Sequence, residues 1–227
     1  MDRPLKLVIF DVDGTLVDSQ DHIVASMAYA FQKAGRTVPS REDALGIVGL
    51  SLPEAMRVLA PDASEAQVLQ LAQDYKNGHT QHREDGAAVA KGPMFEGALD
   101  AIHRLDAAGY ILSAATGKSR AGLNRFLDAQ QISHLFIATQ TADDAPSKPH
   151  PQMVLNCLSG TGIDAANAVM IGDTEFDMAM GRAAGARAIG VRWGYHEEAR
   201  ILRGGAERLL HSFLELDSAV AELVGTP

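Results

Sequence analysis

Short apolar segments alternate with amphipathic segments over the second half of the chain, and this alternation restricts the possible folds most strongly. The apolar segments are 110–116, 135–139, 168–172 and 186–191, and helical spacing of hydrophobic residues follows each of them. Strands that alternate with helices require a parallel sheet with right-handed crossover connections. A further apolar segment, 5–10, has no partner nearby in the sequence and must join this sheet. The pattern predicts a three-layer α/β sandwich around five parallel strands.

The region between the first strand and the rest of the sheet shows helical patterns alone. These patterns cover residues 19–35, 41–47, 52–59 and 64–82, and turn residues separate them. We therefore expect an all-helical insertion of four or five helices. The predicted organisation is a Rossmann-like core of residues 1–16 and 91–227, with a helical domain of residues 17–90 inserted into it. Glycine and proline accumulate at both junctions, including residues 86–93.

Composition excludes several classes of protein. The formal net charge of −9 argues against non-specific binding of nucleic acid. Cys157 is the single cysteine, so an internal disulfide and a cysteine-based zinc cluster are excluded. Neither a signal-peptide pattern nor an apolar run of the ~18 residues needed for a membrane span is present. We expect a cytoplasmic protein, monomeric or homodimeric, that binds neither nucleic acid nor membranes.

Charged residues, hydroxyl groups and glycines follow four of the predicted strands. They are Asp11 and Asp13 after the first strand, Thr116, Gly117 and Lys118 after the second, Lys148 in the loop after the third, and Asp173 and Asp177 after the fourth. In open α/β sheets, ligands bind in the crevice outside the carboxyl ends of the strands. The sequence therefore predicts that these side chains meet in one crevice.

The carboxylates in this set favour a metal ion. Asp11, Asp13 and Asp173 supply oxygen ligands, which suit a hard cation such as Mg²⁺. Clustered carboxylates repel each other unless a cation lies between them. A carboxylate can also attack phosphorus directly and form an aspartyl phosphate.

The remaining groups favour a phosphate. Lys148 would balance negative charge and hold an anion, while Thr116 offers a hydroxyl group and Gly117 an unobstructed backbone N–H. Phosphoryl transfer depends mainly on positioning and charge neutralisation. The expected partner is a small phosphorylated metabolite.

Four segments resemble, in order, the motifs of the haloacid dehalogenase-like hydrolase superfamily. They are "DVDGTLVDS", "SAATGK", "SKPHP" and "GDTEFD". Near the end of the chain, "GVRWGY" and "GGAERLL" are similar to the branch that contains phosphoglycolate phosphatases. The resemblance covers nearly the whole chain and includes the position of the helical insertion. It implies that the insertion is a cap that closes over the cleft and selects the substrate.

The resemblance also implies a role for each motif residue. Asp11 would be the nucleophile, and Asp13 would protonate the leaving oxygen and then deprotonate the attacking water. Mg²⁺ would be held by a side-chain oxygen of Asp11, the backbone carbonyl of Asp13 and the side chain of Asp173. Thr116, Gly117 and Lys148 would hold the phosphoryl group.

Other residues receive supporting roles. Asp177 would support the metal site. Lys118 and Arg120 are candidates for substrate contact because they follow the second motif directly. Residues 46–51, which include Gly49, join two helices of the insertion, and in related caps such a loop faces the active site.

Four residues with reactive or aromatic side chains are expected to be structural. His79 and His82 lie in a polar helix end and are expected to face solvent. Trp193 and Tyr195 follow the last predicted strand and are expected to contribute packing.

The predicted function is Mg²⁺-dependent hydrolysis of a small phosphate monoester, with phosphoglycolate as the leading named substrate. Asp13 favours phosphoester chemistry over dehalogenation, because related dehalogenases lack an acid two residues after the nucleophile. The first alternative is a phosphosugar mutase similar to β-phosphoglucomutase, which passes the phosphoryl group on. The second is a phosphate-binding regulatory protein without catalysis.

Overall fold

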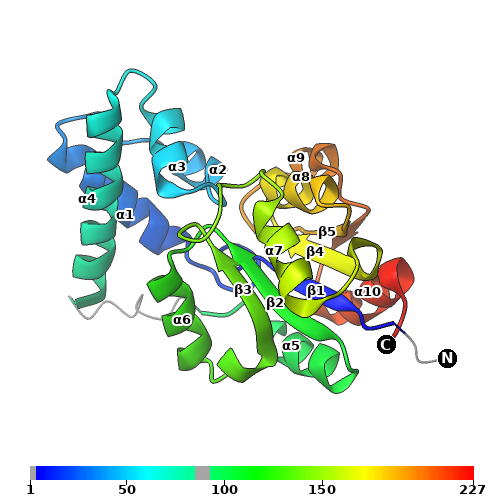
Figure 1. The fold of residues 1–227 in the computed structure, drawn as a ribbon. Coiled ribbons are helices and arrows are strands. Elements are labelled where there is room, and N and C mark those ends of the chain that lie inside the picture. The colour runs from blue at the N-terminus through cyan, green and yellow to red at the C-terminus, as the bar shows by residue number, and fades with distance from the viewer. Residues whose placement is uncertain (1–3, 85–92) are drawn as a thin grey trace.

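A parallel sheet lies at the centre of the computed structural model, which describes residues 4–84 and 93–227 (Figure 1). Within these residues the sheet has six strands in the order β3-β2-β1-β4-β5-β6. The strands are β1 (Leu7–Phe10), β2 (Ile111–Thr116), β3 (Phe136–Thr141), β4 (Ala168–Gly172), β5 (Arg187–Val191) and β6 (Arg208–Leu210). The strand β1 pairs with both β2 and β4, so the residues that follow it lie at the middle of the carboxyl edge.

The sheet has one strand more than predicted. The additional strand, β6, lies at the edge beyond β5, and the five-strand prediction is wrong on this point. Its three residues are too few to show an apolar pattern, and Leu210 is the one that is buried. A short helix before it, α9 (Glu198–Gly204), was not predicted either.

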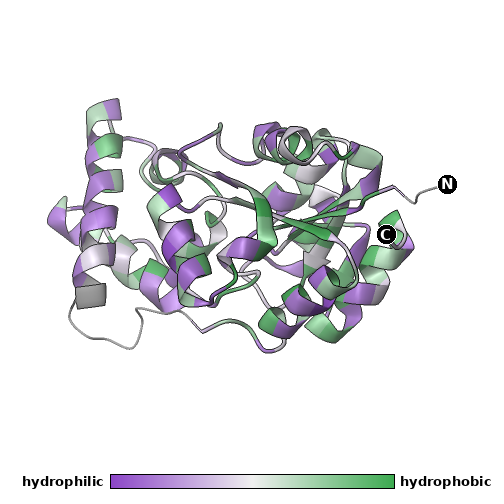
Figure 2. Cartoon of the chain, turned by 60° about the horizontal axis from the view of Figure 1, so that its bottom comes forward, coloured by the Kyte–Doolittle hydropathy of each residue, from purple (hydrophilic) through white to green (hydrophobic). Residues whose placement is uncertain are grey.

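Helices cover both faces of the sheet and form three layers with it. Packing against one face are α5 (Ala98–Ala107), α6 (Arg120–Ala129) and α10 (Leu216–Val224). Packing against the other are α7 (Gln152–Thr161) and α8 (Glu175–Ala183). All four residues of β1 are buried, as expected for a parallel strand covered on both faces. Figure 2 shows hydrophobic residues along the strands and hydrophilic residues on the outer sides of the helices.

The segment between β1 and α5 forms a separate group of helices. They are α1 (Gln20–Lys33), α2 (Arg41–Gly46), α3 (Leu52–Leu59) and α4 (Glu65–Glu84), and we call them the helical block (Figure 1). Helix α1 packs along α4, and the block has a hydrophobic core of its own that includes Met27, Phe31, Met56 and Leu71. The predicted all-helical insertion is therefore seen as four helices within the described residues.

The two chain segments that connect the helical block to the sheet lie side by side. Val17 forms an antiparallel bridge with Met94, and the Asp18 N–H donates to the Pro93 carbonyl at 3.0 Å. The predicted boundary between residues 90 and 91, and most of the predicted linker 86–93, lie outside the described residues. A division into domains at residues 16/17 and 90/91 therefore stays a prediction.

None of the described helices combines the length and the apolar character that crossing a membrane requires.

Candidate active site

The carboxyl ends of β1, β2 and β4 bring the predicted motif residues together. The Asp11 N–H donates to the Ile171 carbonyl at 2.9 Å, so sheet pairing with β4 continues one residue beyond β1. This bond fixes Asp11 beside Asp173, which follows β4. Thr116 is the last residue of β2 and is buried, as are Asp11 and Asp173.

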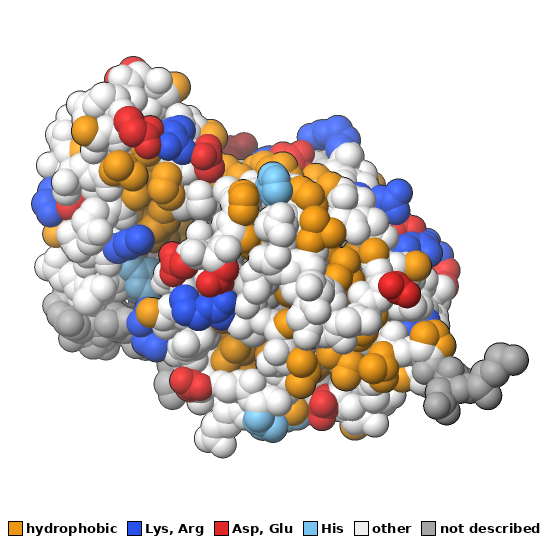
Figure 3. Space-filling model, viewed as in Figure 1, with side chains coloured by type: hydrophobic (Ala, Val, Ile, Leu, Met, Phe, Trp, Pro, Cys, Tyr) orange, Lys and Arg blue, Asp and Glu red, His pale blue; other side chains and the backbone are white. Residues whose placement is uncertain are grey.

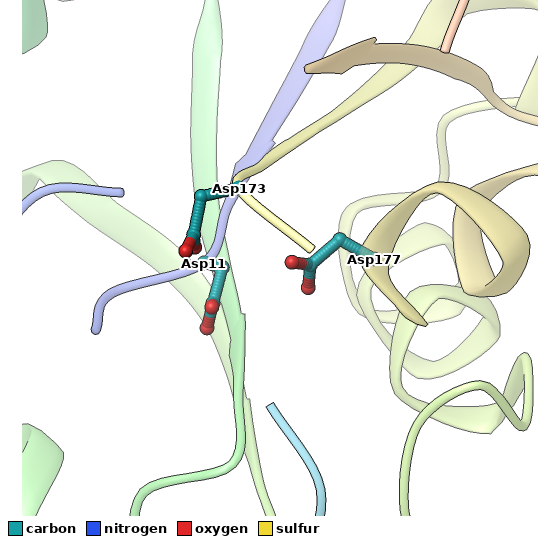
Figure 4. Close-up of side chains that lie close together, drawn as sticks. All are labelled: Asp11, Asp173 and Asp177. Atoms are coloured by element: carbon teal, nitrogen blue, oxygen red, sulfur yellow. The ribbon is translucent and has the colours of Figure 1, made fainter. Parts of the chain in front are cut away.

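Three buried aspartates form a cluster at this edge. Asp11, Asp173 and Asp177 each offer a carboxylate oxygen, and these atoms lie within 4.8 Å of one another (Figure 4). The pKa of Asp11 is raised to about 6. Burial and the negative charge of Asp177 raise it, and together they outweigh the lowering effect of Lys148. Burial, with the charges of Asp177 and Asp11, raises the pKa of Asp173 well above its usual range. A cation at the cluster would relieve this repulsion.

Lys148 supplies one buried positive charge to the cluster. Its Nζ lies 2.8 Å from Asp11 Oδ1 and 2.6 Å from Asp177 Oδ1, and its side chain is fully buried. Burial lowers the pKa of Lys148, but the charges of Asp11 and Asp177 outweigh burial and raise this pKa above its usual value. Lys148 therefore stays charged. Three carboxylates and one ammonium leave a net charge of −2 when all are ionised. A divalent cation would neutralise it.

Asp177 and Asp11 differ in how their oxygens are occupied. Asp177 Oδ2 accepts from the Thr174 N–H at 3.1 Å and from Thr174 Oγ1 at 2.6 Å. The Asp177 N–H donates to Thr174 Oγ1 at 3.2 Å, which completes the capping box that begins α8. Both oxygens of Asp11 are buried, and whereas Oδ1 has the Lys148 ammonium at 2.8 Å, Oδ2 has no hydrogen-bond partner among the described residues. Buried carboxylate oxygens need a partner, so Asp11 is the member of the cluster prepared for a ligand. The all-oxygen donor set fits a divalent metal ion.

Asp173 is held from several sides. Thr15 Oγ1 donates to its Oδ1 at 3.0 Å, and the Tyr195 N–H donates to its Oδ2 at 2.8 Å. A Cβ atom at position 14 would lie 2.2 Å from Asp173 Oδ2, and one at position 194 would lie 2.1 Å from Asp173 Cβ. Positions 14 and 194 therefore need glycine, because any side chain there would collide with Asp173. Gly14 also has a φ of +83°, which other residues rarely adopt.

Asp13 is bound by a lysine and a serine. Lys118 Nζ lies 2.7 Å from Asp13 Oδ1, and the Ser19 hydroxyl donates to the same oxygen. Burial favours a raised pKa for Asp13, but Lys118 and Ser19 outweigh it and lower the pKa. The Ser19 N–H in turn donates to the Tyr195 hydroxyl oxygen at 2.9 Å. Tyr195 therefore does more than the packing expected of it: it contacts Asp173, and it contacts Ser19, which in turn binds Asp13.

The end of β2 meets a loop of the helical block. A Cβ atom at Gly117 would lie 3.0 Å from the Gly49 carbonyl oxygen and 3.1 Å from that of Leu50. Gly49 has a φ of +100° and also lies against Thr174. The loop 46–51 thus lies directly over the strand ends.

Arg120 is not brought to the cluster. Its guanidinium group donates to the Thr139 carbonyl at 2.8 Å and contacts Asp144, while its backbone N–H donates to Asp143 at 2.7 Å. These contacts tie the start of α6 to β3 and the loop after it. Arg120 is also absent from the lining of the pocket between the strand ends and the helical block.

A pocket of about 360 Å³ lies between the strand ends and the helical block. Asp11, Asp13, Thr116, Gly117 and Lys118 line one end of it, and Gly49 lines the loop side.

The helical block contributes residues that the sequence did not single out for this pocket. Among them are His22, Tyr75 and His79. The expectation that His79 faces solvent is wrong, because its ring lies 3.8 Å, centroid to centroid, from that of His22 in the pocket wall. The sequence of α4 does not show which of its faces another helix will cover.

Comparisons with known proteins agree with the order of the motifs. The family of haloacid dehalogenase-like hydrolases matches residues 8–191. "Probable phosphatase IndB" from Dickeya dadantii is 33% identical over 220 residues, which cover 96% of this chain and 94% of that protein. Pyrophosphatase PpaX from Bacillus pumilus is 30% identical over 213 residues, which cover 93% of this chain and 94% of that protein. A phosphoglycolate phosphatase from Aliivibrio fischeri is 27% identical, with 86% of this chain and 88% of that protein covered.

Solved structures share the fold. A haloacid dehalogenase-like hydrolase from Streptococcus pneumoniae has a TM-score of 0.80 at 25% identity, with 95% of this chain and 98% of that chain covered. A hydrolase from Pseudomonas syringae has a TM-score of 0.84 at 23% identity, with 96% and 99% covered. The resemblance expected from the four motifs is confirmed, and the chain belongs to the haloacid dehalogenase-like hydrolase family.

Proposed function

We propose that the chain hydrolyses a small phosphate monoester through an aspartyl phosphate on Asp11, with Mg²⁺ bound at the aspartate cluster. It is a phosphatase of its family, in keeping with the relatives described above. The observation that carries the proposal is the buried Asp11 carboxylate, whose Oδ1 pairs with Lys148 and whose Oδ2 has no hydrogen-bond partner among the described residues. Such a carboxylate is poised to bind a metal and a phosphoryl group rather than to stabilise the fold.

In the first step an Asp11 carboxylate oxygen attacks phosphorus. The bond from phosphorus to the ester oxygen breaks as the new bond forms, and the leaving oxygen takes a proton from Asp13. Lys118 holds the pKa of Asp13 down in the structure. An entering phosphate group would attract Lys118 and weaken its pairing with Asp13, which would then bind the proton it must donate.

In the second step water attacks the same phosphorus. The Asp13 carboxylate takes a proton from this water, the bond between phosphorus and Asp11 breaks, and inorganic phosphate leaves. The Thr116 hydroxyl, the Gly117 N–H and the Lys148 ammonium would hold the phosphoryl oxygens during both steps. Their convergence at the carboxyl ends of the strands supports this assignment.

The residues present fit a magnesium ion. Side-chain oxygens of Asp11 and Asp173, with the backbone carbonyl of Asp13, would hold it, and Asp177 would support the site because its own oxygens are bound by Thr174 and Lys148. The bound ion would neutralise charge on the phosphoryl group.

The helical block is proposed to act as a cap of residues 17–90 over a core of residues 1–16 and 91–227. Its loop 46–51 covers Gly117, and its helices line the pocket that contains Asp11. The phosphoglycolate phosphatase among the relatives supports phosphoglycolate as one substrate to test. The pyrophosphatase makes pyrophosphate another.

Phosphate release from a panel of metabolite esters, with Mg²⁺ and with a chelator, tests this function. We expect release that depends on Mg²⁺. A mutase similar to β-phosphoglucomutase would release little phosphate from a generic aryl phosphate and would need a bisphosphate activator. Absence of release across the whole panel would favour the non-catalytic alternative.

The covalent step has its own test. Asp13→Asn should still accept the phosphoryl group from 4-nitrophenyl phosphate, because that leaving group needs no proton, but should not release it. Mass spectrometry should then find one phosphoryl group on the peptide that contains Asp11. A wild-type rate of phosphate release in this variant would refute the acid–base role of Asp13, and a blocked variant with an unmodified peptide would refute the role of Asp11.

A further inference from the structure

The pocket changes character where it enters the helical block. Beyond Asp11 and Asp13 its wall is formed by hydrophobic residues from α1, α3 and the loop 46–51. Those nearest the core of the block are Met27, Ile47, Leu52 and Ala55. Figure 3 shows hydrophobic side chains on this lobe beside the groove that separates it from the rest of the molecule.

Three rings extend this wall. His22 from α1, with Tyr75 and His79 from α4, line the pocket. The His22 and His79 rings meet edge to face, and the Tyr75 and His79 centroids lie 6.5 Å apart. Rings arranged in this way contact the faces and edges of another ring favourably.

The positive charges along the pocket are few and unevenly placed. Among the described lining residues the lysines and arginines are Lys76, Lys118 and Arg125. Lys118 pairs with Asp13, while Lys76 and Arg125 are exposed. A carboxylate or second phosphate placed against Met27 would lose its water to an apolar side chain, and an anion in this pocket would also meet the negative charge of Asp13.

We propose that the substrate's leaving alcohol carries an uncharged, ring-sized apolar group, which the helical block binds. This inference rests on the phosphate monoester hydrolysis proposed above. The pocket volume of about 360 Å³ lies within the range of small-molecule sites, about 300–1,000 Å³. Two-carbon acids and pyrophosphate would leave the apolar wall uncovered, so substrates of that kind fit less well.

Three phosphate esters test the proposal on the wild-type protein with Mg²⁺: benzyl phosphate, ethyl phosphate and phosphoglycolate. Benzyl and ethyl alcohol are similar in acidity, so the comparison isolates binding of the ring. We expect kcat/KM for benzyl phosphate to exceed that of each of the other two by at least about 10-fold. Equal values for benzyl and ethyl phosphate, or a preference for phosphoglycolate, would overturn the proposal.

A pair of substitutions in one helix locates the effect. Leu52 begins α3 and lines the pocket, whereas Val58 of the same helix is 59% exposed and does not line it. Leu52→Gln should lower the ratio of benzyl to ethyl phosphate kcat/KM by at least about 5-fold, and Val58→Gln should leave it unchanged. An unchanged ratio in Leu52→Gln, with thermal unfolding like that of wild type, would contradict the proposed wall.

The outcomes separate this proposal from the proposed function. Hydrolysis of ethyl phosphate or phosphoglycolate without a preference for the benzyl ester would leave the phosphatase assignment in place and remove the apolar substrate class. Absence of hydrolysis for every ester would remove both.

Discussion

The two ends of the pocket are built on different principles. At the sheet end, the carboxylate oxygens of Asp11, Asp173 and Asp177 lie within 4.8 Å of one another, and the buried Lys148 pairs with Asp11 and Asp177. At the helical end, the wall consists of hydrophobic residues and rings that come from separate helices. The difference teaches how reaction and selection can be separated in one fold. Under the function proposed above, the charged end acts on the phosphate common to all esters, and the apolar end acts on the part that varies.

The two ends also respond differently to change. A buried ion pair is costly to break from one side, because the remaining partner stays charged and desolvated. Apolar walls accept substitutions of similar volume at a cost usually below about 1.5 kcal/mol. We therefore expect substitutions at the sheet end to reduce hydrolysis of every ester. Substitutions at the helical end should instead change which esters are preferred.

The largest expected effect is at Asp11. Asp11→Asn should reduce hydrolysis of every ester by at least about 10³-fold, because the amide cannot form the aspartyl phosphate. The same change removes one of the repelling carboxylates, so the melting temperature should stay the same or rise. Phosphate release and thermal unfolding measure the two effects. Substantial remaining activity would show that the chemistry does not depend on the sheet end as proposed.

Lys148 tests the cost of the buried charges. Lys148→Met leaves Asp11 and Asp177 buried without their cation, and the free energy of unfolding should fall by about 3–5 kcal/mol. Lys33→Met is the matched control in the helical block, because Lys33 pairs with Asp74 but is half exposed. In urea unfolding its loss should be clearly smaller than that of Lys148→Met, because solvent screens the exposed lysine. Equal losses would mean that the two regions do not differ in this respect.

His196 tests the junction between the two regions. Its Nδ1 accepts from the Glu175 N–H at 3.2 Å, and its Nε2 donates to the Gly46 carbonyl at 3.1 Å, an arrangement that needs a neutral ring. Burial, and then the Arg200 charge, lower its pKa from 6.5 to about 4, although the Asp177 and Glu175 charges oppose this.

Because this pKa is lowered on folding, the neutral ring stabilises the protein above pH 6.5, and that contribution is lost as the pH falls towards 4. Between pH 7 and pH 5 the loss should be about 2 kcal/mol. Urea unfolding at both pH values should show a smaller decrease for His196→Gln than for wild type. Identical decreases would contradict a neutral His196.

The smallest expected effect is at Tyr195. Tyr195→Phe removes the oxygen that accepts from the Ser19 N–H, so Asp13 should be held less firmly and kcat should fall by about 2- to 10-fold, with little change in KM. Tyr110→Phe is the control, because it removes a hydrogen bond of 3.0 Å to the Gly225 carbonyl away from the site. A fall in kcat for both variants would indicate a general structural effect.

Much of the sheet end could be predicted from the sequence because each of its residues directly follows an apolar strand. Asp11, Thr116 and Asp173 needed only the rule that parallel strands share a carboxyl edge. Lys148 follows β3 through a longer loop, and the order of motifs was what identified it. The strand β6 escaped prediction because three residues carry too little pattern.

The helical end could not be predicted in the same way. His22 and His79 belong to different helices, and their contact depends on how α1 packs along α4. Tyr195 reaches Ser19 across 176 positions of the chain. Contacts of this kind arise from tertiary packing, which the local spacing of residues does not determine.

The central place of β1 in the sheet has a consequence for biosynthesis. Leu7 pairs with Ile111 on one side and with Ala168 on the other, so the strand that precedes Asp11 is synthesised long before either neighbour. Contacts this distant along the chain close late in folding. A nascent chain that ended before β4 would contain Asp11 and Asp13 but lack Asp173 and the strand that orients them. The buried aspartate cluster can therefore form only after β4 and Asp173 have been synthesised, and under the proposed function a shorter nascent chain would not act on phosphates.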